Sequence, residues 1–178
     1  MKILFTDIET TSLTALMGRV LCCSFCELDG AAWTMRADSS KFKGESLIDD
    51  GKLVQAIRDE WEKYDLLVVH NGRLFDIPFL NARLAKSGER PFQPHFILDT
   101  LYYLNSSSMR IGSAKLVNAQ KFFQLGEAKT EIDWATWQLA AAGDRAALDS
   151  VVEHCEADVR VLRELYWHVL PYVRNLHR

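Results

Sequence analysis

The sequence lacks long uninterrupted hydrophobic stretches, and this absence limits where the chain can reside. No run approaches the roughly 18 consecutive apolar residues that a membrane-spanning helix requires. The N-terminus also lacks a basic segment followed by a long apolar stretch, which is the pattern of a secretory signal. We therefore expect a soluble, cytoplasmic protein with no membrane partner.

An excess of basic residues is absent as well. Lysine and arginine number 21 against 24 aspartates and glutamates, which gives a formal net charge of −3. This balance excludes a strongly basic coat for nucleic acid. It does not exclude an enzyme that acts on phosphates, because a site built from carboxylates is acidic only until its metal ions bind, and the bound ions can then hold a phosphate.

The cysteines lack the pattern of a zinc site. Cys23 and Cys26 form a CxxC, but they lie in a segment with the composition of a strand, where residues three apart face opposite ways. Cys155 falls in a segment of helical periodicity and has no CxxC companion. We interpret the cysteines as buried free thiols, as expected in a reducing cytoplasm.

What the sequence does contain fits one domain of the α/β class. Its 178 residues are 48% hydrophobic and 25% charged, and they show no internal repeat, so we expect a single domain over 1–178. Apolar patterns predict strands at 2–8, 19–28, 31–36, 66–70 and 95–98. Helical periodicity runs from Leu47 to Trp61 and predicts further helices at 75–87, 100–105, 113–124, 133–142 and 145–170.

The order of these elements predicts how the sheet is built. Asp29-Gly30, between the second and third strands, is a dipeptide favoured at tight hairpin turns, so these strands should pair antiparallel. The fourth strand is almost entirely apolar, which is typical of a strand covered on both faces. Helices separate it from the strands before and after it. The predicted fold is therefore a mixed five-stranded sheet flanked by helices.

Four acidic residues occur where these elements begin or end, or on a long helix. Asp7 and Glu9 close the first strand, and because side chains alternate along a strand, they point to the same side. Two like charges this close repel each other, and a divalent cation between them is the simplest way to keep both ionised. Asp76 at a helix start and Asp158 on the last long helix are candidate further ligands.

Each acid also has an ordinary structural explanation. The two strand acids can be solvated, Asp76 can cap its helix, and Asp158 can pair with Arg160 or Arg163 on the surface. Their joint occurrence favours a common site over these separate explanations. Asp99 is different, since it follows a strand and precedes a helix; we interpret it as an N-cap and leave it out of the site.

Three segments, in this order, resemble the motifs of a known family. They are the D-x-E of Asp7 and Glu9, the N-x-x-x-F-D with a following proline at 71–78, and H-C-x-x-D-V at 154–159. Over its whole length the chain resembles the DEDD (DnaQ-like) family of 3′-to-5′ exonucleases in the ribonuclease H-like superfamily.

The third motif combines features of two branches of that family. His154 lies one helical turn before Asp158 and on the same face, which is the spacing of the tyrosine form, Y-C-x-x-D-V, with His in place of Tyr. Histidine is the residue of the other branch, but position 153 is Glu153. The branch and the identity of the general base therefore stay open.

The resemblance implies a ribonuclease H-like fold and hydrolysis of the terminal phosphodiester at single-stranded DNA or RNA 3′ ends. Two Mg²⁺ or Mn²⁺ ions about 4 Å apart would be held with Asp7 bridging them, Glu9 and Asp158 on the nucleophile side and Asp76 on the other. His154 would accept the proton of the attacking water, since imidazole titrates near neutral pH. The product would be a nucleoside 5′-monophosphate, and a replication or repair protein is the implied partner.

The same resemblance implies contacts to the substrate. Thr10 and Leu13 would line the pocket for the terminal nucleotide, with Leu13 as an apolar wedge against a base. Asn71 would join them as a substrate-binding residue of the second motif. Phe75 would stack on a base, and core packing is the alternative interpretation of this side chain.

Two other functions compete with this one. The first is a catalytically silent nucleic-acid-binding or polymerase-associated module of the same fold. The four intact acids favour an enzyme, because a module that only binds does not need them all. The second is an endonuclease, which a closed circular substrate would reveal.

Overall fold

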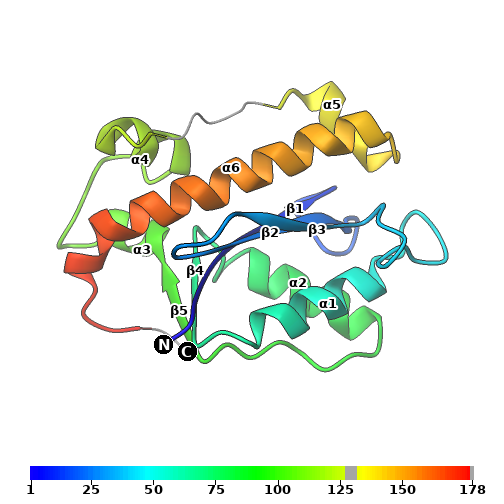
Figure 1. The fold of residues 1–178 in the computed structure, drawn as a ribbon, viewed down its shortest axis with the longest axis horizontal. Helices are drawn as coiled ribbons and strands as arrows, with labels where there is room; N and C mark the ends of the chain where they lie inside the picture. Colours follow the sequence, from blue (N-terminus) through cyan, green and yellow to red (C-terminus); the bar gives the residue numbers. More distant parts are fainter. Residues whose placement is uncertain (127–131, 177–178) are drawn as a thin grey trace.

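The protein folds around a mixed five-stranded sheet with the strand order β3-β2-β1-β4-β5 (Figure 1). The computed structural model describes residues 1–126 and 132–176. β1 pairs antiparallel with β2, and β2 with β3, whereas the pairs β1–β4 and β4–β5 are parallel. The predicted mixed sheet is confirmed. The strands span Ile3–Thr10 (β1), Val20–Glu27 (β2), Trp33–Arg36 (β3), Leu66–Val69 (β4) and Phe96–Asp99 (β5).

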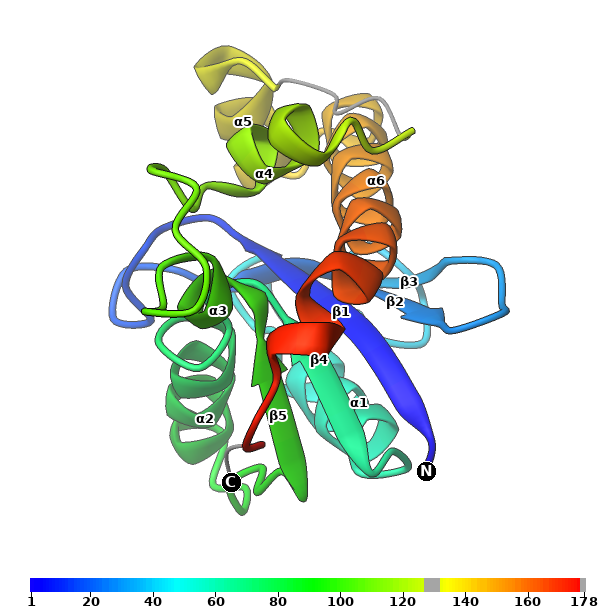
Figure 2. The same ribbon diagram turned by 90° about the vertical axis from the view of Figure 1, so that its left-hand side faces the viewer.

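Helices cover both faces of the sheet. Figure 2 shows α1 and α2 on one face, while the long helix α6 crosses the other. Near the two ends of α6 lie α4 and α5, which both pack against it (Figure 1). The helices span Gly51–Trp61 (α1), Asp76–Lys86 (α2), Thr100–Leu104 (α3), Leu116–Phe123 (α4), Trp134–Ala141 (α5) and Arg145–Val169 (α6), with a short 3₁₀ helix at Leu170–Tyr172.

The central strand β1 divides its side chains between the two faces. Leu4 and Ile8 join the core that α1 and α2 cover, whereas Phe5 joins the core beneath α6 and stacks edge-on against Tyr166 of that helix. Because alternate residues share a face, Asp7 and Glu9 lie on the side of Phe5. The alternation of side chains along β1 therefore points both acids toward α6.

Two local predictions are wrong. The first helix begins at Gly51 rather than at Leu47, whose side chain is 52% exposed in the preceding loop. The hairpin between β2 and β3 is also wider than the tight turn expected at Asp29-Gly30, since its last strand pair is Phe25 with Trp33. Arg163 of α6 stabilises this wider loop by donating to the Gly30 carbonyl at 2.7 Å.

The cysteines behave as predicted. All four are buried free thiols. Cys23 belongs to the core under α1 and α2, while Cys26 belongs to the core under α6, so the CxxC side chains face opposite ways. Among the helices of residues 1–126 and 132–176, none is long and apolar enough to cross a membrane.

Candidate active site

Asp7 lies where three elements meet. Its strand is central in the sheet, and α6 packs across the face to which its side chain points. The Cys155 thiol of α6 lies 3.4 Å from the Asp7 backbone carbonyl and 3.8 Å from its Oδ2. This contact fixes how α6 docks on β1. It also brings the third predicted motif next to the first.

The other three acids act on the charge of Asp7. Burial raises the pKa of the Asp7 carboxyl well above its usual range, and the negative charges of Asp76, Glu9 and Asp158 raise it further. The other three predicted ligands therefore lie near enough to Asp7 to act on its charge. The repulsion among them is the condition that a bound cation relieves.

Asp76 reaches this group from the start of α2. Phe75, not Asp76, occupies the N-cap position of that helix, so the capping explanation is wrong. The Asp76 carboxylate instead accepts a hydrogen bond from the Ile8 backbone N–H at 3.1 Å, which ties α2 to β1. Burial raises the pKa of Asp76 to about 7, although its backbone hydrogen bonds act in the opposite direction.

His154 lies between two of the acids. Its Nε2 atom is 3.8 Å from Glu9 Oε1 and 3.8 Å from Asp158 Oδ2, and its side chain is 13% exposed. The one-turn spacing predicted from the sequence thus places the imidazole beside both carboxylates. A water molecule near these groups would be within reach of a proton acceptor.

Asp158 does not lie on the surface, where the alternative interpretation placed it in an ion pair with Arg160 or Arg163. Asp158 is buried on the inner side of α6, at 9% exposure. Arg163 donates to the hairpin carbonyl at Gly30, and Arg160 lies 3.8 Å from Glu156. Asp99 caps α3 by accepting from the Leu101 N–H, as predicted.

The donors present fit a divalent cation. Asp7, Glu9 and Cys155 offer ligand atoms that all lie within 4.8 Å of one another. Hard cations such as Mg²⁺ and Mn²⁺ prefer carboxylate oxygens, which the acids supply. Cys155 is a neighbour that the sequence analysis did not place in the site. Burial raises the pKa of its thiol well above the usual range, so it is a proton-bearing neighbour of Asp7.

A pocket of about 700 Å³ opens beside Glu9. Of the predicted substrate-binding residues, Thr10, Leu13 and Phe75 line it. Phe75 also packs against Phe79, with ring centroids 5.6 Å apart, so this side chain serves both the core and the pocket. The two interpretations of Phe75 are thus compatible.

Asn71 has a different position. It is not among the described residues that line the pocket. Its backbone adopts the left-handed conformation with φ at 68°, and its N–H donates to Asp99 Oδ1 at 2.8 Å. The next residue must be small, because a Cβ on Gly72 would lie 2.6 Å from the Cβ of Val69. The motif therefore builds a sharp turn that leads into Asp76.

Two residues of the pocket were not predicted from the sequence. Trp134 and Trp137 of α5 line it, and the Trp137 indole N–H donates to the Thr10 carbonyl at 3.1 Å. No local motif marks these residues, since α5 is far from the first motif in the sequence. The sequence shows only two tryptophans three residues apart in a short apolar segment, which does not indicate where that segment packs.

Comparison with known proteins agrees with this architecture. The model of the RNase H superfamily matches residues 4–170. Among solved structures, the family B DNA polymerase from the hyperthermophilic archaeon Pyrobaculum calidifontis superposes with a TM-score of 0.74 over 96% of this chain, at 19% identity. The match covers 25% of that polymerase, so this chain corresponds to a quarter of its length. No curated protein matches the sequence.

At this identity the polymerase supports the fold alone. The family model carries more weight, because it spans nearly the whole chain, from β1 through α6. It includes every acid of the candidate site. On this evidence the chain belongs to the RNase H superfamily.

Proposed function

We propose that the protein is a metal-dependent 3′-to-5′ exonuclease that releases nucleoside 5′-monophosphates from single-stranded ends. One observation carries the proposal: three carboxylates from β1, α2 and α6 lie around that of Asp7, next to a pocket that can hold a nucleotide. Membership of the RNase H superfamily supports a nucleic-acid substrate, and both DNA and RNA ends are candidates.

In this proposal the acids share the binding of two Mg²⁺ or Mn²⁺ ions. Asp7 is central to the group and would hold the ions together with Glu9, Asp158 and Asp76. When bound, the ions would supply Lewis-acid stabilisation of the scissile phosphate and lower the pKa of the attacking water. Their charge would also neutralise the acids, which otherwise repel a phosphate.

The remaining chemistry belongs to side chains around the acids. His154 would accept the proton of the attacking water, since its Nε2 lies beside Glu9 and Asp158. Thr10 and Leu13 would hold the terminal nucleotide in the pocket next to Glu9. A pocket that seats the last nucleotide favours an exonuclease over an endonuclease. An endonuclease site must let the nucleic-acid chain continue on both sides of the bond that is cleaved.

The direct test is digestion of 5′-labelled single-stranded DNA and RNA oligonucleotides in Mg²⁺, in Mn²⁺ or with a chelator. We expect a ladder that shortens from the 3′ end with either cation and no reaction with the chelator. A blocked 3′ end and closed circular single-stranded DNA should both resist digestion. Shortening from the 5′ end, or cleavage of the circle, would reject the proposed polarity or the exonuclease class.

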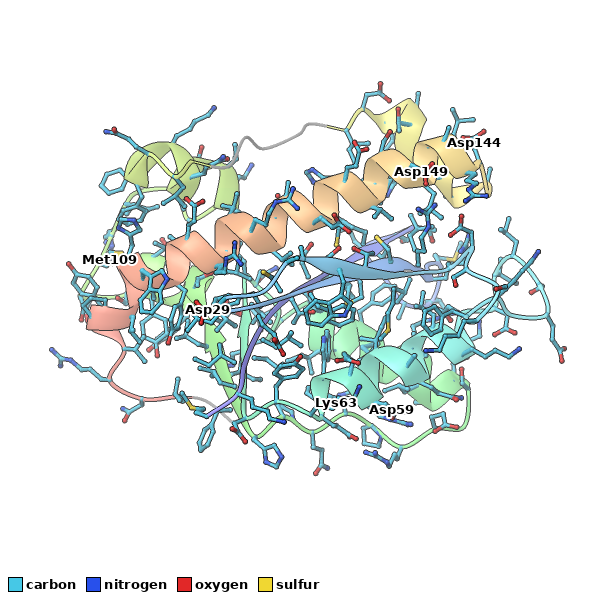
Figure 3. The ribbon with its side chains drawn as sticks, viewed as in Figure 1. Asp29, Asp59, Lys63, Met109, Asp144 and Asp149 are labelled. Atoms are coloured by element: carbon cyan, nitrogen blue, oxygen red, sulfur yellow. The ribbon has the colours of Figure 1, made fainter. Side chains whose placement is uncertain are left out.

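Substitution of Asp7 tests the metal site itself. Asp7→Asn removes the carboxylate on which the others converge, so cleavage should fall by several orders of magnitude while circular dichroism shows an intact fold. The matched control is Asp29→Asn in the exposed hairpin between β2 and β3, which should cleave like the unmodified protein (Figure 3). Unchanged turnover in Asp7→Asn would rule out the site.

A further inference from the structure

A second pocket, of about 380 Å³, is separate from the acids of the candidate site. It forms where the loop between β3 and α1 meets the connection from α5 to α6 (Figure 1). Part of its wall is apolar and includes Leu21, Leu47 and Leu148, while the polar part includes Arg19 and Lys43. None of the four predicted metal ligands is among its described lining residues. The proposed cleavage therefore leaves this pocket without a role.

Arg19 is the unusual residue of this pocket, because its guanidinium is buried with few partners. The residue is 6% exposed. Within the described part of the chain its side chain makes one hydrogen bond, from Nη2 to the Ala141 carbonyl at 3.1 Å. A guanidinium has several N–H donors and keeps its charge in a protein. Burial of a charge and of donors without partners is unfavourable, and an anion bound in the pocket would supply those partners.

The charges next to Arg19 leave positive charge in excess. Burial lowers the pKa of Arg19, and the positive charge of Arg83 also lowers it, whereas the negative charge of Asp50 acts in the opposite direction. The Asp50 carboxylate is already engaged by Arg83 and by the Val20 N–H. Two guanidinium groups therefore share one carboxylate, and the charge of Arg19 is not balanced by these neighbours.

The acids that line the pocket have other partners or face solvent. Both carboxylate oxygens of Asp38 accept from Arg36, at 2.6 and 2.9 Å. The Asp49 carboxylate accepts from two backbone N–H groups, at 2.9 and 3.0 Å. Glu45 is exposed, so dissolved ions screen its charge. Lys43 comes from the same loop and adds a second positive charge to that of Arg19.

We propose that this pocket binds an organic phosphate monoester, with the phosphate on Arg19 and Lys43 and the attached organic group against the apolar wall. A guanidinium matches phosphate oxygens with paired hydrogen bonds, and a lysine adds a point charge. The pocket volume falls in the range of small-molecule sites. A nucleoside 5′-monophosphate belongs to this ligand class. It is the expected product of the proposed cleavage, and only this choice of ligand rests on the proposed function.

The test measures binding of adenosine 5′-monophosphate by isothermal titration calorimetry, with a chelator present so that no cation draws the nucleotide to the acids. Adenosine and inorganic phosphate are measured separately, because each lacks one half of the probe. The nucleotide should bind more tightly than either. Arg19→Met should weaken nucleotide binding about ten-fold, and Lys43→Ala about five-fold, since each removes a positive charge that contacts the phosphate.

The control is Lys41→Ala, which should not change the affinity. Lys41 is an exposed lysine of the same loop and is not among the described residues that line the pocket. Lys43 is also exposed, so Lys43→Ala should fold even if Arg19→Met does not.

Three results would overturn the inference: no binding of the nucleotide to the unmodified protein, unchanged affinity in Lys43→Ala, or equal affinity for the nucleotide and inorganic phosphate. The last result would mean that the apolar wall has no role. Binding that depends on Arg19 and Lys43, without a digestion ladder in Mg²⁺ or Mn²⁺, would support the inference and overturn the proposed exonuclease activity instead.

Discussion

At the scale of single residues, the buried acids make the metal-free protein sensitive to pH. Burial raises the pKa of Asp76 to about 7 and shifts Asp7 in the same direction. A carboxyl with a raised pKa favours the folded state while it is protonated. Its contribution is therefore complete at low pH and is lost as the pH rises toward the folded pKa.

We expect the melting temperature in chelator to fall between about pH 5 and about pH 7. Acids with lowered pKa values, such as Glu62, titrate below this interval and do not obscure it. Mg²⁺ or Mn²⁺ should restore stability more at pH 8 than at pH 5, because the cation replaces the protons. Thermal melts across this range measure the effect. Asp76→Asn should flatten the profile, and an equally steep fall in this variant would contradict the assignment.

His154 is tested by kinetics. His154→Ala should lower kcat more than it raises KM, because the imidazole is assigned to proton transfer rather than to substrate binding. His154→Tyr should keep part of the rate, since the chain has histidine at the tyrosine spacing. His95→Ala, an exposed histidine before β5, is the control and should have no effect. Indistinguishable rates in all these variants would remove His154 from the mechanism.

Much of the site could be predicted from the sequence at this scale. Strand alternation is enough to place Asp7 and Glu9 together, and helical spacing places His154 with Asp158. The position of Cys155 beside Asp7 depends on how α6 crosses β1. The same is true of Trp134, which reaches the pocket from a distant helix. Such contacts between distant segments have no local signature in a single sequence.

At the scale of helices and loops, a buried ion pair fixes the elements around the site. Arg83 of α2 donates from Nη2 to Asp50 Oδ1 at 2.6 Å and also to the carbonyls of Ala15 and Ile48. Asp50 in turn accepts from the Val20 N–H at 2.8 Å. This pair joins α2 to the start of α1 and to the loop after β1.

We expect Arg83→Met to destabilise the protein by about 3–5 kcal/mol, since it leaves the Asp50 carboxylate buried without its partner. Urea denaturation measures this change. The double variant Arg83→Met with Asp50→Asn should recover part of the loss. Lys63→Ala breaks an exposed pair with Glu60 on α1 and should leave the urea midpoint almost unchanged (Figure 3). A similar, small effect of both single changes would show that the buried pair has no special role.

The same ion pair explains why the start of α1 was predicted wrongly. Leu47 continues the apolar spacing of the helix, but the Asp50 carboxylate is held by Arg83 and the Val20 N–H, which fixes the chain outside the helix until Gly51. Arg163 has a comparable effect on the wide β2–β3 hairpin, because it donates hydrogen bonds to carbonyls there. In both cases a distant arginine overrides a local preference.

At the scale of the whole molecule, one sheet carries buried apolar clusters on both of its faces, and the described residues form three of them. α1 and α2 bury apolar side chains on one face, and α3, α4 and α6 do so on the other. The strands contribute to both, so neither face can lose its packing without exposing the sheet. The hydrophobic periodicity predicts each strand and helix separately, but it does not assign the helices to faces.

Calorimetry should therefore show a single unfolding transition. Leu53→Ala on α1 and Leu162→Ala on α6 remove fully or nearly fully buried side chains from opposite faces. Each should lower the stability of this one transition by about 2–5 kcal/mol. If one of these variants splits the unfolding into two steps, the two faces form separate cooperative units.

The central position of β1 in the sheet protects the acids of the site from local unfolding. β1 is hydrogen-bonded on both sides and is covered by helices on both faces, so its local exchange with solvent requires the most extensive unfolding. The acids on β1 therefore keep their positions while peripheral segments fluctuate. Trp134 belongs to a short outer helix, so this wall of the pocket lies outside the sheet. Entry and release of a nucleotide can thus proceed while the ion-binding groups remain rigid.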